Sequence, residues 1–486
     1  MRCPNGTRKN KDGVCVPKAA AAAPSPRQCP KGTREYKGVC IPIRCPNGTR
    51  KYKGECIPKG QKPVKLSATT RCPKGSRKKN GECVPTHAEK PGLVENAVSR
   101  IQRFMNRTKN KRREMYLKTI CSEAGVCIAF GIETLKIKEF FRNFAFDLVD
   151  KVKRIGAPSS NGFVNEVRFT KRGYNAFAVL KSSASYGADN LMYEYRVGQF
   201  LNKMSLLFPC FLETYGLFKY KGHQEWYHMY STKEVTPGVF RDSIDPQPFD
   251  LAVGCARSRH IAVLIQHIRG CQTVKEWLTP QTVQHMLPIL FQVYYPLFHM
   301  RKHFTHYDLH TENVLLYEPA PGKFIQYHYH TDKGVISFQS PYIAKIIDYG
   351  RCYFKDGEDS KDIYDQLCRL PECEETCGDE RGYGSFPLSN EKQFYHIVSQ
   401  KKNESHDLRF LTMVLEMVKP YAPWFDAFKL EYTHRFGTAE KSCKRKQCDV
   451  EGVYRKLEKM TLDTVKGEVY GELHIYSDRP LEFRKI

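Results

Sequence analysis

The segment 306–313 reads HYDLHTEN and places an aspartate and an asparagine five residues apart. Asp308 is suited to accept or orient the proton of an attacking hydroxyl, and Asn313 can turn back to coordinate magnesium on phosphate groups. A second carboxylate, Asp348, directly follows the apolar run 342–347. An aspartate there can bridge magnesium to the β- and γ-phosphates. The pattern predicts phosphoryl-transfer chemistry, with Asp308 as catalytic base and Asn313 and Asp348 as metal ligands.

A lysine that could bind the same phosphates lies at the end of an apolar strand pattern. Residues 177–181 read FAVLK, and Lys181 would contact the α- and β-phosphates. Glu194 follows thirteen residues later in a helical segment, where it can pair with Lys181 and hold it in place. Each residue also has a structural explanation without function. Lys181 could be a surface lysine at a strand end, Glu194 a solvated helix residue and Asp348 a turn former. All three of these explanations would have to be true at once.

The segment 157–164, APSSNGFV, aligns with the phosphate-covering pattern G-x-G-x-x-G-x-V. Of its three glycines only Gly162 is retained, while Ala157 and Ser159 stand at the other two positions and Val164 at the valine. Backbone amides of such a loop can still cover phosphates, though less closely. We therefore expect these four residues to line a nucleotide site.

Together these five elements appear in the order found in protein kinases, across about 190 residues. The predicted fold class is α+β, a bilobal protein-kinase-like fold preceded by a basic cysteine-repeat region. The predicted cofactors are ATP and Mg²⁺, with Asp308, Lys181 and Asn313 as catalytic residues.

Other segments supply the elements that must position these residues. The stretch 282–303 has apolar residues at helical spacing and leads into the catalytic loop. The apolar strand pattern 261–268 leads to the hinge between lobes, where backbone groups of Gln266 and His267 would bind adenine. Asp407 begins another helical run. It either braces the catalytic loop or caps its own helix.

The N-terminus contains four repeats, whose cysteine pairs are separated by 11 residues in three copies and by 12 in the first. A Pro-x-Gly turn follows the first cysteine, and a glycine lies two residues before the second, which predicts hairpins. Units this small need a staple if they are ordered. A local disulfide, zinc shared between adjacent units and a reduced, disordered basic arm all remain open. The pairs are Cys3/Cys15, Cys29/Cys40, Cys45/Cys56 and Cys72/Cys83.

The net charge of +26 is concentrated in the first fifth of the chain. Residues 1–92 hold 22 Lys and Arg against 5 Asp and Glu, which leaves only +9 for the rest. Such a segment attracts nucleic acid or another polyanion, or serves as a solubilising tail. Because the start of the sequence is polar, we expect no signal peptide. The sequence contains no run of 18 apolar residues, so we expect no membrane span.

With these motifs in place, the chain resembles the serine/threonine protein kinases of large nucleocytoplasmic DNA viruses, such as iridoviruses and mimiviruses. The resemblance covers roughly residues 115–480 and rests on HYDLHTENVLL, KIIDYG, NGFVNEV and AVLK. The basic CPNGTR repeats are similar to those at the front of such proteins. The resemblance implies ATP-dependent phosphorylation of a protein, and a location in the virion or the host cytoplasm.

Three features depart from the kinase pattern. His310 replaces the lysine two residues after Asp308, as in the loop of aminoglycoside and choline phosphotransferases, which leaves the substrate class open. Asp348 follows Asp308 by 40 positions, and the insertion between them contains Tyr-His-Tyr-His at 327–330, either a strand with alternating aromatics or a metal site. No A-P-E follows. In its place Cys368, Cys373 and Cys377, with Cys352, are either zinc ligands or ordinary free or disulfide-linked cysteines.

We predict four regions: repeats at 1–92, a helical extension at 93–150, a small lobe and hinge at 151–270, and a large lobe at 271–486. The extension, with Phe140, Phe141, Phe144 and Phe146, is expected to pack on the small lobe rather than on a membrane surface. The leading functional hypothesis is an active protein kinase. A catalytically silent virion or nucleic-acid-binding scaffold and a small-molecule phosphotransferase are the alternatives.

Overall fold

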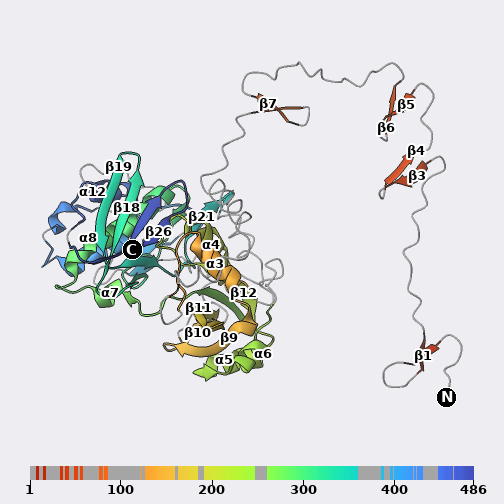
Figure 1. Ribbon diagram of the computed structural model, residues 1–486, viewed down its shortest axis with the longest axis horizontal. Coiled ribbons are helices and arrows are strands. Elements are labelled where there is room, and N and C mark those ends of the chain that lie inside the picture. Colours follow the sequence, from red (N-terminus) through yellow and green to blue (C-terminus); the bar gives the residue numbers. More distant parts are fainter. Residues whose placement is uncertain are drawn as a thin grey trace. The chain divides into compact units, whose positions relative to one another are not determined.

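The structure is a computed structural model, and it divides the chain into two units, Met1–Ala88 and Glu89–Ile486 (Figure 1). In the second unit it describes residues 121, 126–158, 162–183, 191–246, 260–359, 385–387, 394–397, 399–419, 421–422, 424–430, 447–463 and 465–486. In the first unit it describes the strands of the repeats. Each unit is treated by itself below.

Each N-terminal repeat contains one two-stranded antiparallel hairpin, as the turn residues predict. The side chains of the repeat cysteines lie outside the described residues, so the choice between disulfide, zinc and reduced thiols stays a prediction. The hairpins are β1 (Thr7–Lys9) with β2 (Cys15–Pro17), β3 (Thr33–Tyr36) with β4 (Val39–Pro42), β5 (Thr49–Tyr52) with β6 (Glu55–Pro58), and β7 (Ser76–Lys79) with β8 (Glu82–Pro85).

A six-stranded antiparallel sheet forms the centre of residues 151–270, the region predicted as the small lobe, in the order β12-β14-β11-β10-β9-β13. Along β10 buried and half-buried residues alternate, because successive side chains of a strand point to opposite faces. Its strands are β9 (Val149–Ile155), β10 (Gly162–Lys171), β11 (Tyr174–Ser183), β12 (Thr214–Lys219), β13 (Glu234–Val235) and β14 (Ile261–Gln266). Helix α4 (Leu191–Met204) packs on β12 and β14, and α5 (His223–Ser231) and α6 (Pro237–Ser243) lie beside each other, with α6 against β9.

The described part of the predicted extension, residues 121 and 126–150, contains one α-helix and one 3₁₀ helix. Helix α3 (Glu133–Phe140) ends where Arg142, Asn143 and Phe144 adopt φ values of 53°, 54° and 59°. This left-handed turn is followed by the 3₁₀ helix η1 (Phe146–Leu148). The phenylalanines of the turn still pack on the small lobe as expected, because Phe144 contacts Phe169 and Phe146 contacts Phe218. Among the described residues, a disulfide joins Cys121 to Cys127.

Helix α8 (Met286–Met300) is the centre of the large lobe, and nearly all of its residues are buried. Its buried Gln292 accepts a hydrogen bond from the Ala344 amide and donates to the Tyr342 carbonyl, which fixes the helix to β20. The other helical segments here are α7 (Val274–Trp277), η4 (Val283–His285), α11 (Leu408–Val418), η5 (Phe425–Ala427) and α12 (Val450–Leu457).

Small sheets surround α8. One has the order β15-β17-β20, built from β15 (Gln272–Thr273), β17 (Val314–Tyr317) and β20 (Ile343–Ile346), and another has the order β16-β21-β22. The latter consists of β16 (Phe304–Thr305), β21 (Tyr353–Asp356) and β22 (Glu358–Asp359), and a separate hairpin joins β23 (Ser385–Pro387) to β24 (Phe394–His396).

The insertion between Asp308 and Asp348 forms the hairpin of β18 (Phe324–Thr331) and β19 (Gly334–Ser340). It joins the C-terminal strands β25 (Val469–Tyr476) and β26 (Glu482–Lys485) in a sheet of order β19-β18-β25-β26. Figure 1 shows the paired strands β18 and β19 of this sheet beside each other. Tyr327 and Tyr329 are buried while His328 and His330 are half-buried, so this segment is the alternating strand that the sequence favours.

Two hydrophobic cores hold this unit together, one centred on α8 and one on the small-lobe sheet with the extension. The fold is therefore mixed α and β, with several sheets and two cores. No helix in the described part of the chain has both the length and the apolar composition that crossing a membrane requires.

Candidate active site

Lys181 contacts one acidic residue before the predicted hinge, Glu194, and one after it, Asp348. Its ammonium group donates to Glu194 Oε2 and to Asp348 Oδ1, each at 2.8 Å. Lys181 comes from β11, Glu194 from the first turn of α4 and Asp348 from the loop after β20. Glu194 is 2% exposed, so its charge is desolvated and needs this partner. The positive charge of Lys181 lowers the pKa of Asp348 and keeps that carboxyl ionised.

Asn313 and Asp348 lie at neighbouring ends of two paired strands. Asn313 immediately precedes β17 and Asp348 comes two residues after β20, and these strands pair in antiparallel register with Val314 opposite Ile346. The Ile347 amide donates to the Asn313 carbonyl at 3.0 Å. The Asn313 amide nitrogen donates to the Asp308 carbonyl at 2.9 Å. The expected catalytic and metal-binding loops are thus bound directly to each other.

The backbone is strained at two positions of this site. Tyr307 and Asp348 have φ values of 63° and 69°, which are uncommon for residues with a Cβ. Such conformations persist only where the surroundings determine them. Beside Asp348, the Tyr349 hydroxyl accepts from the Leu212 amide and donates to the Ile346 carbonyl.

Asp407 braces the catalytic loop. Its carboxylate accepts hydrogen bonds from the amides of His306, at 2.8 Å, and Tyr307, at 3.0 Å. It makes no side-chain cap for its own helix α11. Of the two interpretations open from the sequence, the structure therefore supports the brace. Burial raises the pKa of Asp407 to about 7, although the two amide donors act in the opposite direction.

Two arginines that the sequence analysis missed surround the Asp308 carboxylate. Arg409 Nη1 lies 3.0 Å from Asp308 Oδ1, and Arg351 Nη1 lies 3.7 Å from Oδ2. The side chain of each of these three residues is 15–17% exposed. Neither arginine belongs to a motif used above. The signal available was proximity in sequence: Arg409 follows the bracing Asp407 by two residues, and Arg351 follows Asp348 by three.

His310 also lies close to Asp308, the predicted catalytic base. Its Nε2 lies 3.8 Å from Asp308 Oδ1. Burial lowers the pKa of His310, so the imidazole is neutral near pH 7 and does not supply the charge of a lysine. The permanent positive charges next to Asp308 come from Arg409 and Arg351 instead.

The predicted phosphate loop lies between β9 and β10. Val164 pairs directly with Lys181 across β10 and β11, which places both on the same face of the sheet. Gly162 begins β10, and Ala157 is exposed in the loop. Ser159 lies outside the described residues.

Gln266 and His267 end β14, at the predicted hinge. The Gln266 amide donates to the Glu213 carbonyl and the His267 amide donates to the Phe177 carbonyl, so both N–H groups are used within the sheet. An adenine ring would have to meet their carbonyls or the following peptide groups. The His267 side chain contacts Glu166 Oε2 at 3.1 Å.

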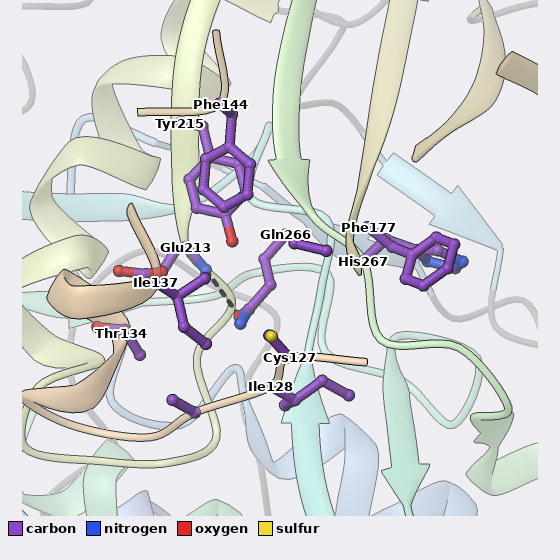
Figure 2. Close-up of a pocket in the computed structure, with 12 residues that line it drawn as sticks. Cys127, Ile128, Thr134, Ile137, Phe144, Phe177, Glu213, Tyr215, Gln266 and His267 are labelled. Atoms are coloured by element: carbon purple, nitrogen blue, oxygen red, sulfur yellow. Dashed lines mark hydrogen bonds between the residues drawn. The ribbon is translucent and has the colours of Figure 1, made fainter. Parts of the chain in front are cut away.

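A small pocket with room for about one water molecule lies beside Gln266. Figure 2 shows the Gln266 side chain reaching toward Glu213, between residues of the extension and of the small lobe. Phe144 stacks on Tyr215 with ring centres 3.9 Å apart. The extension thus covers this side of the hinge, and the side chain of Gln266 is occupied there.

The proposed zinc cluster around Cys352 is only partly described. Cys352 is completely buried, and burial raises the pKa of its thiol. Cys368, Cys373 and Cys377 lie outside the described residues, so that hypothesis stays a prediction.

No protein-family model and no curated protein sequence matches the chain. Among solved structures, the chain is weakly similar to "WaaP in complex with acyl carrier protein", at 10% sequence identity and a TM-score of 0.23. The alignment covers 48% of this chain and 76% of that chain. A likeness at this level supports no conclusion about function, so the chemistry is inferred from the geometry of the site.

Proposed function

We propose that this protein is an ATP-dependent phosphotransferase of the protein-kinase-like class, and that it transfers the γ-phosphoryl group to a serine or threonine hydroxyl of a protein. The observation that carries the proposal is the contact of Lys181 with both Glu194 and Asp348 at 2.8 Å. This contact joins a small-lobe strand, a small-lobe helix and a large-lobe loop at one point. A lysine so held is suited to neutralise phosphate oxygens.

In the proposed reaction the Asp308 carboxylate orients the acceptor hydroxyl and takes its proton as the new oxygen–phosphorus bond forms. The bond between the γ-phosphorus and the bridging oxygen breaks, and ADP leaves. Lys181 holds the α- and β-phosphates, and Arg409 and Arg351 offset the charge near Asp308. Positioning and charge neutralisation supply most of the rate in such sites.

The residues expected to bind magnesium fit that ion. Asp348 offers a carboxylate that is kept ionised by Lys181. Asn313 uses its amide nitrogen on the Asp308 carbonyl, so its side-chain oxygen is the atom suited to a cation. An all-oxygen donor set is the one that magnesium prefers, and the bound ion would neutralise phosphate charge.

The acceptor class separates the proposal from its closest alternative. A neutral His310 beside Asp308 favours a small-molecule phosphotransferase as the second candidate, because it departs from the lysine of protein kinases. The basic N-terminal repeats favour a macromolecular substrate or anchor, because their charge is attracted to extended acidic surfaces.

The test is phosphate transfer from radiolabelled ATP to a defined mixture of acidic and basic proteins, followed by identification of the modified residues. We expect incorporation on serine or threonine that requires magnesium and that Asp308→Ala reduces to background. Asp242→Ala, which removes an exposed carboxylate of α6, is the matched control and should retain full activity.

Three results would count against the proposal. Incorporation that Asp308→Ala leaves unchanged would show a contaminating kinase. ATP turnover that appears only with small hydroxyl compounds would favour the second candidate. Tight ATP binding without turnover on any acceptor would indicate a catalytically silent scaffold.

A further inference from the structure

Two histidines and a glutamate gather on one face of the sheet β19-β18-β25-β26. His328, Glu472 and His474 are each half-buried, and one ligand-type atom from each lies within 4.8 Å of the others. His474 Nε2 lies 3.6 Å from Glu472 Oε2, and the rings of His328 and His474 stack with centres 4.6 Å apart. Among the described residues, these three side chains form the group of potential metal ligands whose ligand atoms all lie within 4.8 Å of one another.

Strand register explains why the three meet. β18 and β25 run parallel, and His328 lies directly opposite His474. Glu472 precedes His474 by two residues on β25, so both point to the same face. The opposite face carries the buried Tyr327, Tyr329 and Leu473. Packing of the apolar face therefore fixes the polar groups on the other.

Neighbouring side chains set the orientation of both rings. His328 Nδ1 lies 2.9 Å from Ser337 Oγ, and His474 Nδ1 lies 3.2 Å from His330 Nε2. If Nδ1 of each ring donates in these contacts, each Nε2 keeps its lone pair. Metal-binding histidines are held by partners of this kind.

One atom of the cluster is left without a normal partner. Nε2 of His474 is buried and has no hydrogen-bond partner among the described residues. A buried polar atom of this kind calls for a ligand, because leaving it unsatisfied costs free energy. It faces Glu472 at 3.6 Å, too far for a hydrogen bond but suited to a shared ion.

We propose that His328 Nε2, His474 Nε2 and the Glu472 carboxylate bind a divalent transition-metal ion, with zinc as the natural fit, and that this ion fastens the C-terminal strand β25 to the inserted hairpin. Two imidazoles and a carboxylate form a known zinc donor set that leaves a position for water. Ligand atoms around tetrahedral zinc lie about 3.3–3.5 Å apart, given bonds of about 2.0–2.1 Å. The pair at 3.6 Å nearly meets this, and side-chain rotation on a half-exposed face closes the wider pairs.

The site is separate from the predicted phosphotransfer chemistry. Its residues come from the insertion and the C-terminus, and none of them belongs to the elements around Asp308. The metal-site proposal can be tested independently of the proposed function, because its test measures metal content and stability instead of activity.

The experiment measures zinc in the dialysed full-length protein, and follows cobalt titration by absorption spectroscopy. Wild type should bind one equivalent more than the double variant His328→Ala/His474→Ala. The difference spectrum should show weak d–d bands without a thiolate charge-transfer band, because the donors are nitrogen and oxygen. Using the difference removes any contribution from the 19 cysteines. Added zinc should also raise the Tm of wild type more than that of the double variant, since the proposed site exists only in the folded state.

Three further variants sharpen the test. Glu472→Gln preserves shape and should lose the same equivalent, which covers the case in which the double variant unfolds. His330→Gln should weaken zinc binding by about 10- to 100-fold, as loss of an orienting partner does. His228→Ala, at an exposed helix position in the small lobe, is the matched control and should change nothing. Equal zinc content and equal Tm shifts in wild type and Glu472→Gln would overturn the proposal.

Discussion

At the scale of single residues, the charge around Asp308 is the feature that distinguishes this site. His310 is neutral, and Arg409 and Arg351 bring two permanent cations to the carboxylate. An arginine keeps its charge at any physiological pH, whereas a histidine does not. The permanent positive charge beside Asp308 therefore comes from helix α11 and from the loop after Asp348.

Arg409→Ala is expected to lower kcat by about 10²- to 10³-fold, the cost of losing one preorganised charge partner at a reacting centre. Arg409→Lys should recover part of that loss, because it restores charge without the planar fork. Steady-state phosphorylation kinetics would measure both. Arg455→Ala, a half-exposed arginine of α12, is the control. Unchanged kcat in Arg409→Ala would remove this residue from the mechanism.

The buried His306 should make the stability of the protein depend on pH. It is fully buried, and burial lowers its pKa from 6.5 to about 4. Between pH 6.5 and 4 the unfolded chain therefore binds a proton that the folded chain excludes, so stability falls as the pH falls through this window. A pKa lowered from 6.5 to about 4 corresponds to roughly 3 kcal/mol of stability at neutral pH that is lost on acidification.

Replacing His306 should flatten this dependence. In His306→Gln, whose amide can still donate to the Ile347 carbonyl, the free energy of unfolding should lose about 3 kcal/mol less than wild type between pH 6.5 and 4. Urea unfolding at a series of pH values measures the difference. His299, whose pKa burial also lowers to about 4, remains in both proteins and contributes equally. Parallel curves for the two proteins would contradict the assignment.

At the scale of elements, helix α4 must approach the sheet closely to deliver Glu194 to Lys181. Gly198 makes this approach possible. A Cβ at this position would stand 2.1 Å from Thr214 Oγ1 and 2.6 Å from Thr214 Cβ on the buried strand β12. Thr214 is β-branched and 3% exposed, so it has little room to move.

Gly198→Ala should therefore destabilise the protein by about 1–3 kcal/mol through overpacking. It should also reduce phosphotransfer, because α4 must shift away from β12 and carry Glu194 away from Lys181. Gly238→Ala is the control, since its added Cβ would meet nothing closer than 3.8 Å. Chemical unfolding and ATP turnover measure the two effects, and a variant as stable and active as wild type would show that α4 tolerates the displacement.

At the scale of the whole molecule, charge is distributed unevenly along the chain. The repeats of residues 1–92 hold 22 of the 78 Lys and Arg residues but only 5 of the 52 Asp and Glu residues. Phosphate-bearing polymers bind such segments by release of counterions, which makes binding strongly salt-dependent. We therefore predict that the repeats attach the rest of the chain to a polyanion.

Full-length protein should be retained on heparin and on DNA at salt concentrations that elute a variant lacking residues 1–92. The logarithm of the DNA binding constant should fall linearly with the logarithm of salt concentration, by about 0.9 for each phosphate contacted. Phosphotransfer to a small peptide should be unaffected by the deletion. Identical elution of the two proteins would leave the basic segment as a solubilising tail.

Much of this site could be predicted from the sequence, because phosphate chemistry requires particular residue types at short, fixed spacing. Asp308, Asn313 and Asp348 were located by such local patterns, and the brace by Asp407 was one of two interpretations. The extension was harder. Its phenylalanines have helical spacing, but Arg142, Asn143 and Phe144 turn to positive φ, which residue pattern alone does not signal.

The sequence by itself determined which residues are candidates for phosphate chemistry, the order in which they occur along the chain, and the uneven charge of the chain. Only the tertiary structure decided that Arg409 meets Asp308, 101 residues away, and that His474 meets His330, 144 residues away. Local spacing cannot encode such meetings. These contacts depend on how the buried faces of α8, α11 and β18 pack. That packing also fixes the positions of the residues on the outer faces of the same elements, and therefore decides which of them meet.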